Sequence, residues 1–275
     1  MIFGGRKKAD RPKVGLVLGG GGARGFVQVG ALKAFRECGM DFDLCVGTSV
    51  GSIVGALYCA GLTPDEIASA AENVEFSDLH GRILIKPDDP RKIGAVVYKL
   101  IGAAQFEDLP KKFAAVATDL KTGKQIVLDT GSVIDAVSAS SAYPIVYSPL
   151  VKDGMNLSDG GITNNIPADV ARMLGADYVV TVDVHTDRGG GADGTGILDM
   201  VKAVFSIMSA NASVIGLMQS DIIIAPSTKN FGAASKNGYR EMIELGYAAA
   251  MEKRDDIVKL FETPPKERNS RRNKE

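Results

Sequence analysis

Residues 44–61, LCVGTSVGSIVGALYCAG, constrain the fold more than any other stretch of the chain. The run contains no charged side chain and has glycine at every fourth position through Gly47, Gly51 and Gly55. One interpretation is part of a membrane-spanning helix with a small-residue dimerisation face. The other is a buried strand, a sharp turn at Ser49 and a helix, because glycines two residues on either side relieve the crowding in such a turn. The hydroxyl side chains and four glycines within the run favour the second interpretation.

Strand-like and helix-like patterns alternate along the chain. Short apolar runs predict strands over 13–18, 43–47, 113–119, 124–129, 177–184 and 221–226. Amphipathic patterns predict helices over 26–39, 50–60 and 64–74, with Thr63 and Glu66 forming a capping box at the start of the last one. A basic amphipathic helix within 81–110 and a long apolar helix over 197–219 interrupt the alternation. This order favours an α/β fold with a largely parallel central sheet.

Composition indicates an ordinary globular chain of 275 residues, with 45% hydrophobic and 24% charged side chains. We expect one domain over 13–262 between a basic tail at 1–12 and another at 263–275. Residues 1–13 carry five basic and one acidic side chain, and residues 264–275 carry five basic and two acidic ones. No aromatic-interleaved basic face accompanies them, so nucleic acid is not an expected partner. Three cysteines in apolar surroundings indicate buried reduced thiols and a cytoplasmic location: Cys38, Cys45 and Cys59.

A glycine-rich loop, GGGGARG, follows the first predicted strand and opens a helix. Gly20, Gly22 and Gly25 match the G-x-G-x-x-G pattern of dinucleotide sites. The second predicted strand lacks the acidic residue that would hold a ribose, and no Gly-Lys-Ser/Thr follows the loop. The loop therefore predicts converging backbone N–H groups that bind an anion or stabilise an oxyanion, with the positive charge of Arg24 beside them.

The pattern GTSVG over 47–51 predicts a nucleophilic serine, Ser49, on a strand-to-helix turn. A serine nucleophile needs a base, and the residues alone leave two candidates. His185 follows a strand and would complete a Ser-Asp-His order with Asp159. Alternatively, Asp159 itself, placed before two glycines, accepts the proton directly from Ser49. His80 lies in a polar stretch and is expected to be solvated.

The motifs GGGGARG, GTSVG and DGG, in this order, resemble the patatin-like phospholipase family, bacterial type. The segments SASSAYPIVYSPL and VATDLKTGK extend the resemblance, which runs over about 13–247. It implies a three-layer α/β/α fold and ester hydrolysis by a Ser-Asp dyad, without a metal or other cofactor. The implied site consists of the nucleophile Ser49, the base Asp159, the oxyanion-hole residues Gly20, Gly21, Gly22 and Arg24, the elbow glycines Gly47 and Gly51, and the glycines Gly160 and Gly161 after the aspartate.

The expected function is therefore a serine acyl hydrolase: a phospholipase A, lysophospholipase or lipid esterase. The alternatives are a Ser-His-Asp esterase through His185, an acyltransferase, and a non-catalytic lipid-binding protein. A lipid or acyl ester is the expected substrate. A peripheral contact with the inner membrane surface is expected through 81–110, the helix over 197–219 or the basic tails. The sequence predicts neither the acyl-chain preference nor the oligomeric state.

Overall fold

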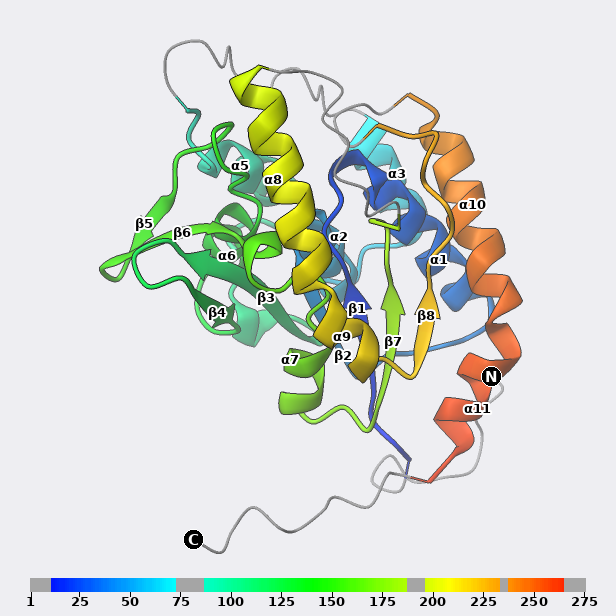
Figure 1. Ribbon diagram of the computed structural model, residues 1–275. Helices are drawn as coiled ribbons and strands as arrows, with labels where there is room; N and C mark the ends of the chain where they lie inside the picture. The colour runs from blue at the N-terminus through cyan, green and yellow to red at the C-terminus, as the bar shows by residue number, and fades with distance from the viewer. Residues whose placement is uncertain (1–10, 73–86, 187–195, 233–236, 265–275) are drawn as a thin grey trace, which may run out of the picture.

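An eight-stranded mixed sheet forms the centre of the protein (Figure 1). The computed structural model describes residues 11–72, 87–186, 196–232 and 237–264. Five parallel strands lie side by side in the order β3 (Lys112–Asp119), β2 (Leu44–Thr48), β1 (Val14–Leu18), β7 (Tyr178–Val182) and β8 (Ile222–Ile224). Three antiparallel strands complete the β3 end: β4 (Lys124–Leu128), β5 (Leu150–Lys152) and β6 (Met155–Asp159).

Helices cover both faces of this sheet, so β1, β2 and β7 are buried on both sides. Leu16 and Leu18 of β1 point into the larger core, whereas the intervening Val17 points into the smaller one. The larger core is built with α1 (Phe26–Glu37), α2 (Val50–Cys59), α3 (Pro64–Glu72), α5 (Arg91–Ile101), α6 (Val133–Ser140), α10 (Tyr239–Glu252) and α11 (Arg254–Glu262). The opposite side carries α7 (Ala168–Met173), α8 (Ile197–Ala212) and α9 (Val214–Gln219) (Figure 1).

Most predicted elements form where the patterns indicate. All six predicted strands are present, and so are the helices at 26–39, 50–60 and 64–74, which end within two residues of their predicted bounds. The Thr63 N–H donates to the Glu66 carboxylate at 2.8 Å and the Glu66 N–H donates to the Thr63 hydroxyl at 3.2 Å, so the capping box is confirmed. The three cysteines are buried free thiols.

Two features differ from the expectations. The hairpin of β5 and β6 was not predicted, and Asp159 is the last residue of β6. The predicted helix over 197–219 divides at Ser213 into α8 and α9. The Ser213 hydroxyl donates to the carbonyl of Ser209 at 2.7 Å, a side-chain bond that commonly accompanies a bend. The predicted tails lie almost entirely outside the described residues, and the division into a domain and two tails stays a prediction.

Candidate active site

Ser49 lies on a strained turn between β2 and α2. Its backbone angles are φ 53° and ψ −125°, a region that non-glycine residues rarely adopt. A Cβ atom on Gly51 would lie 2.0 Å from the carbonyl oxygen of Leu18, and one on Gly47 would lie 2.2 Å from that of Gly51. Only glycine therefore fits at both positions. The strand-turn-helix interpretation of residues 44–61 is the one that the fold adopts.

Ser140, at the end of α6, connects this turn to β3 through two hydrogen bonds. Its Oγ accepts the backbone N–H of Ser49 at 3.0 Å and donates to the Val116 carbonyl of β3 at 2.6 Å. Ser140 is fully buried, so the strained turn is connected to the centre of the sheet. No motif in the sequence indicates a role for Ser140 itself. The run of serines in SASSAYP is the only signal that pointed to its segment.

Strand register brings Asp159 to Ser49. One edge of β3 pairs with β4 from residue 115 to 119, so both β2 and β6 must use the other edge. On that edge Thr48 pairs with Val116, and Asp159 pairs with the next residue, Ala117. Because β2 runs parallel and β6 antiparallel to β3, their carboxyl ends meet. The residue after Thr48 is Ser49, which therefore lies at the end of the strand that carries Asp159.

The Asp159 carboxylate is buried, with 1% of the residue exposed. Burial raises its pKa to about 6, an increase that hydrogen bonds from the Ser49 hydroxyl and the Gly161 N–H partly offset. Oδ1 accepts the Gly161 N–H at 2.8 Å. Oδ2 has no hydrogen-bond partner of ordinary geometry, so the hydrogen bond between this carboxylate and the Ser49 hydroxyl is weak. Such contacts commonly tighten once a substrate is bound.

The glycine-rich loop lies on the other side of Ser49. A Cβ atom on Gly20 would be 3.2 Å from the Cβ of Ser49 and 2.4 Å from the Asn165 side chain. The Gly20 N–H donates to the carbonyl of Asn165 at 3.3 Å. The short helix η1 (Gly22–Gly25) follows, and the first N–H groups of a helix have no acceptor within it. The amides around Gly21 and Gly22 are therefore better suited to hold an oxyanion than that of Gly20.

The model of the family described as patatin-like phospholipase matches residues 16–172. This range contains the loop, the turn and Asp159. The chain belongs to the patatin-like phospholipase family. The resemblance inferred from the three motifs is therefore confirmed.

Curated relatives of this family member include bacterial and mammalian proteins. An uncharacterized NTE family protein of Mycobacterium tuberculosis is 35% identical over 194 residues, which are 67% of this chain and 52% of the relative. Patatin-like phospholipase domain-containing protein 6 of Homo sapiens is 37% identical over 181 residues, which are 62% of this chain and 13% of that protein. The chain thus spans about half the length of the mycobacterial relative and a small part of the human one.

Solved structures share the fold of this patatin-like chain. VipD from Legionella pneumophila superposes with a TM-score of 0.62 at 14% identity, covering 92% of this chain and 69% of VipD. Human GIVD cytosolic phospholipase A2 gives a TM-score of 0.52 at 9% identity, covering 94% of this chain and 61% of that one. The predicted three-layer α/β/α fold is confirmed, with its parallel strands at the centre and its antiparallel strands at one end.

Two further predicted residues have partners on other elements. The Arg24 Nε donates to the Phe231 carbonyl at 3.0 Å, so this guanidinium connects η1 to the segment after β8. His185 follows β7, with its Nε2 3.3 Å from the Ser206 hydroxyl of α8. His80 lies outside the described residues. In the part of the chain that the structure describes, no three His, Cys, Asp or Glu side chains gather as metal ligands would.

Helix α8 covers the carboxylate side of the site. A Cβ atom on Gly161 would lie 3.0 Å from the Ser209 hydroxyl and 3.1 Å from the Phe205 ring. The Phe205 and Tyr143 rings are 4.4 Å apart, and the pKa of Tyr143 rises to about 12 through burial and the charge of Asp159. These side chains lie close to Asp159, whose burial is the physical cause of its raised pKa.

Proposed function

We propose that this chain is a serine acyl hydrolase that cleaves phospholipids or related lipid esters through Ser49 and Asp159. One observation carries the proposal: the ends of β2 and β6 meet on one edge of β3, which pairs a strained serine with a buried carboxylate. The family to which the chain belongs supports a lipid substrate. Structural similarity to human GIVD cytosolic phospholipase A2 supports the fold on which such a site is built.

In the proposed reaction, Ser49 Oγ attacks the ester carbonyl while the Asp159 carboxylate accepts its proton. A free aspartate is a weak base at neutral pH, and a pKa of about 6 brings Asp159 closer to the value that general-base catalysis favours. The N–H groups around Gly21 and Gly22 would stabilise the oxyanion. The alcohol departs with the proton from Asp159, and water then hydrolyses the acyl-serine by the same route.

The test is fatty-acid release from lysophospholipid and from esters of graded chain length, with wild type and three variants side by side. Ser49→Ala and Asp159→Asn should lose activity by about a thousand-fold or more, because each removes a participant in proton transfer. His185→Ala should retain activity within about ten-fold, because in this proposal the imidazole takes no part in the chemistry. Circular dichroism would establish that each variant is folded.

The outcomes separate the proposal from its alternatives. Loss of activity in all three folded variants would point to a Ser-His-Asp triad. Transfer of the acyl group to an added alcohol in preference to water would identify an acyltransferase. Lipid binding without turnover by wild type, unchanged in Ser49→Ala, would identify a lipid-binding protein. Chain-length dependence of the rate would then narrow the substrate class. Action at the inner membrane surface stays a prediction.

A further inference from the structure

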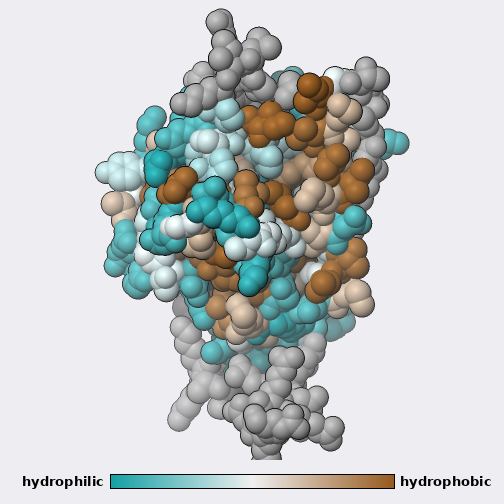
Figure 2. All heavy atoms as spheres, turned by 60° about the vertical axis from the view of Figure 1, so that its left-hand side comes forward, coloured by the Kyte–Doolittle hydropathy of each residue, from teal (hydrophilic) through white to brown (hydrophobic). Residues whose placement is uncertain are grey.

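The outer side of α8 and α9 is an exposed apolar surface. Of the thirteen large hydrophobic residues exposed on the described chain, eight lie on these two helices: Ile197, Met200, Val204, Ile207, Met208, Val214, Ile215 and Met218. Figure 2 shows hydrophobic residues in a column down the right-hand side of that view, where α8 and α9 lie. We call this set of eight residues the outer face. An exposed apolar patch of this kind marks an interaction site.

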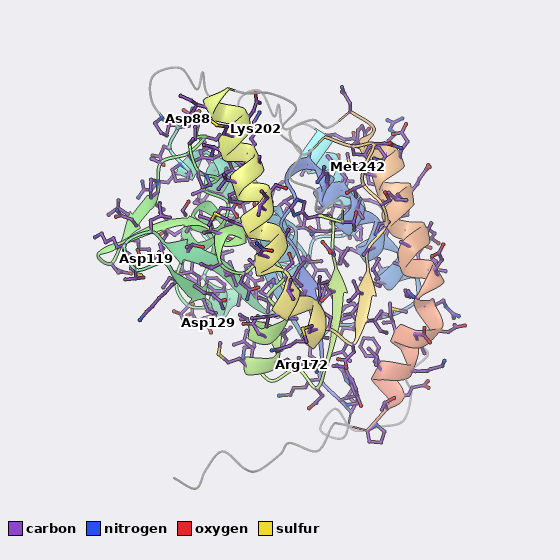
Figure 3. All side chains as sticks on the ribbon, in the orientation of Figure 1. Asp88, Asp119, Asp129, Arg172, Lys202 and Met242 are labelled. Atoms are coloured by element: carbon purple, nitrogen blue, oxygen red, sulfur yellow. The ribbon has the colours of Figure 1, made fainter. Side chains whose placement is uncertain are left out.

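The outer face is uncharged along most of its length. Residues 203–220 include no Asp, Glu, Lys or Arg. At the three- and four-residue steps that define one side of a helix, the polar members are Asn211 and Gln219, the last residue of α9. Lys202 lies near the start of α8 and Arg172 lies beside α9, so charged side chains flank the uncharged stretch at both ends (Figure 3). A surface helix ordinarily has charged residues on its solvent side, so this pattern is inverted.

The inner side of the same helices packs closely against the rest of the protein. A Cβ atom on Gly216 would lie 1.7 Å from the Ile166 carbonyl oxygen, and Ser209 and Ser213 are fully buried. Within the described residues, Asp199–Gln219 is the one helical stretch long and apolar enough to cross a membrane by length and composition. Because its inner side is packed on the protein, it has one free face, as helices that lie in a membrane interface do.

The chemistry of the outer face favours lipid as its occupant. A transient protein interface is about as polar as the rest of a protein surface and uses many hydrogen bonds, for which only Asn211 and Gln219 lie beside the outer face. Lipid hydrocarbon forms no hydrogen bonds and so needs no polar partners on this face. The inner side of α8 contacts Gly161 through Phe205 and Ser209, so the outer face lies about one helix diameter, roughly 10 Å, from the site. An acyl chain that leaves a bilayer next to this helix would not have to cross water. Exposing an acyl chain to water costs free energy that grows with each methylene.

We propose that the outer face docks on the hydrocarbon boundary of a phospholipid surface and brings the Ser49 site to its substrate. This inference rests on the proposed function. It also distinguishes the outer face from the basic tails, because contact with hydrocarbon does not require anionic lipid and is little affected by salt.

The test measures sedimentation of the full chain with phosphatidylcholine vesicles, which are neutral, at low and high salt. The double variant Val204→Glu/Met218→Glu places two charges on the outer face. We expect its partition to fall at least ten-fold, since each exposed apolar side chain contributes roughly ten-fold to partition. Val151→Glu on β5 is the control, because Val151 is an apolar residue away from these helices whose exposure, 66%, lies between those of Val204 and Met218. It should bind vesicles as wild type does.

Hydrolysis of a soluble short-chain ester, measured in parallel, separates this inference from the proposed function. The double variant should retain that activity and lose hydrolysis of vesicle lipid. Wild type that hydrolyses the soluble ester without binding vesicles would overturn the docking inference alone. Vesicle binding without any ester hydrolysis would overturn the proposed function instead. Binding that requires anionic lipid and disappears at high salt, or a wild-type dimer that Met218→Glu dissociates, would also overturn the docking inference.

Discussion

Asp159→Asn should inactivate the enzyme and at the same time stabilise its fold. The ordinary pKa of an aspartate is 3.8, and burial raises that of Asp159 to about 6. At a pH between these two pKa values, the carboxyl group is protonated in the folded protein and ionised in the unfolded chain. Unfolding then releases a proton, so the free energy of unfolding falls as pH rises through this window. Above pH 6 the folded protein bears the full free-energy cost of a buried, ionised carboxylate. The rise in the pKa of Asp159 sets this cost at about 3 kcal/mol.

Asparagine removes this penalty while preserving the local contacts. Its amide oxygen can accept the Gly161 N–H that Oδ1 accepts at 2.8 Å, and its NH₂ group takes the place of the loosely partnered Oδ2. Urea unfolding at pH 7.5 should therefore show Asp159→Asn to be about 2 to 3 kcal/mol more stable than wild type. At pH 4 most of this difference should be absent, because the wild-type carboxyl is protonated there.

The same pKa predicts the pH dependence of catalysis. With a value of about 6, nine tenths of Asp159 is ionised near pH 7 and one tenth near pH 5. We therefore expect kcat/KM of wild type to fall about ten-fold between those pH values. A stability difference that is the same at pH 4 and pH 7.5, or an activity that is flat from pH 5 to pH 7, would refute the reasoning.

Two further predictions concern the turn around Ser49. Ser140→Ala leaves the partly buried N–H of Ser49 without its acceptor and should cost about 1–3 kcal/mol of stability and lower kcat more than it changes KM. Ser138→Ala, which removes a bond to its own helix, is the control, and an equal loss of kcat there would contradict the positioning role. Gly51→Ala forces a Cβ to 2.0 Å from a strand carbonyl and should prevent stable folding, whereas Gly55→Ala meets side chains at 3.0 Å or more and should be milder. Thermal unfolding of both alanine variants checks the second prediction, and comparable melting temperatures would contradict it.

Local chemistry in the sequence was sufficient to predict six of the strands and several of the helices. The strand-turn-helix at residues 44–61, the strands and the capping box at Thr63 depend on periodicity, turn glycines and hydrogen bonds between near neighbours. The G-x-S-x-G spacing indicated the turn at Ser49 from the sequence, and the close approach of backbone carbonyls to Gly47 and Gly51 explains why glycine is needed at both positions. The ordered motifs also identified the family.

Tertiary structure decided how these parts act on one another. From the residues alone, both His185 and Asp159 remained candidate bases, because their distances to Ser49 depend on strand order and register. Pairing of β2 and β6 with the same edge of β3 brings Asp159 to the serine. The position of α8 also depends on tertiary packing: its inner side lies against Gly161, next to the buried carboxylate, while its outer side is left exposed. Apolar periodicity predicts that a helix has a buried face, but which face that is depends on packing between segments far apart in the chain.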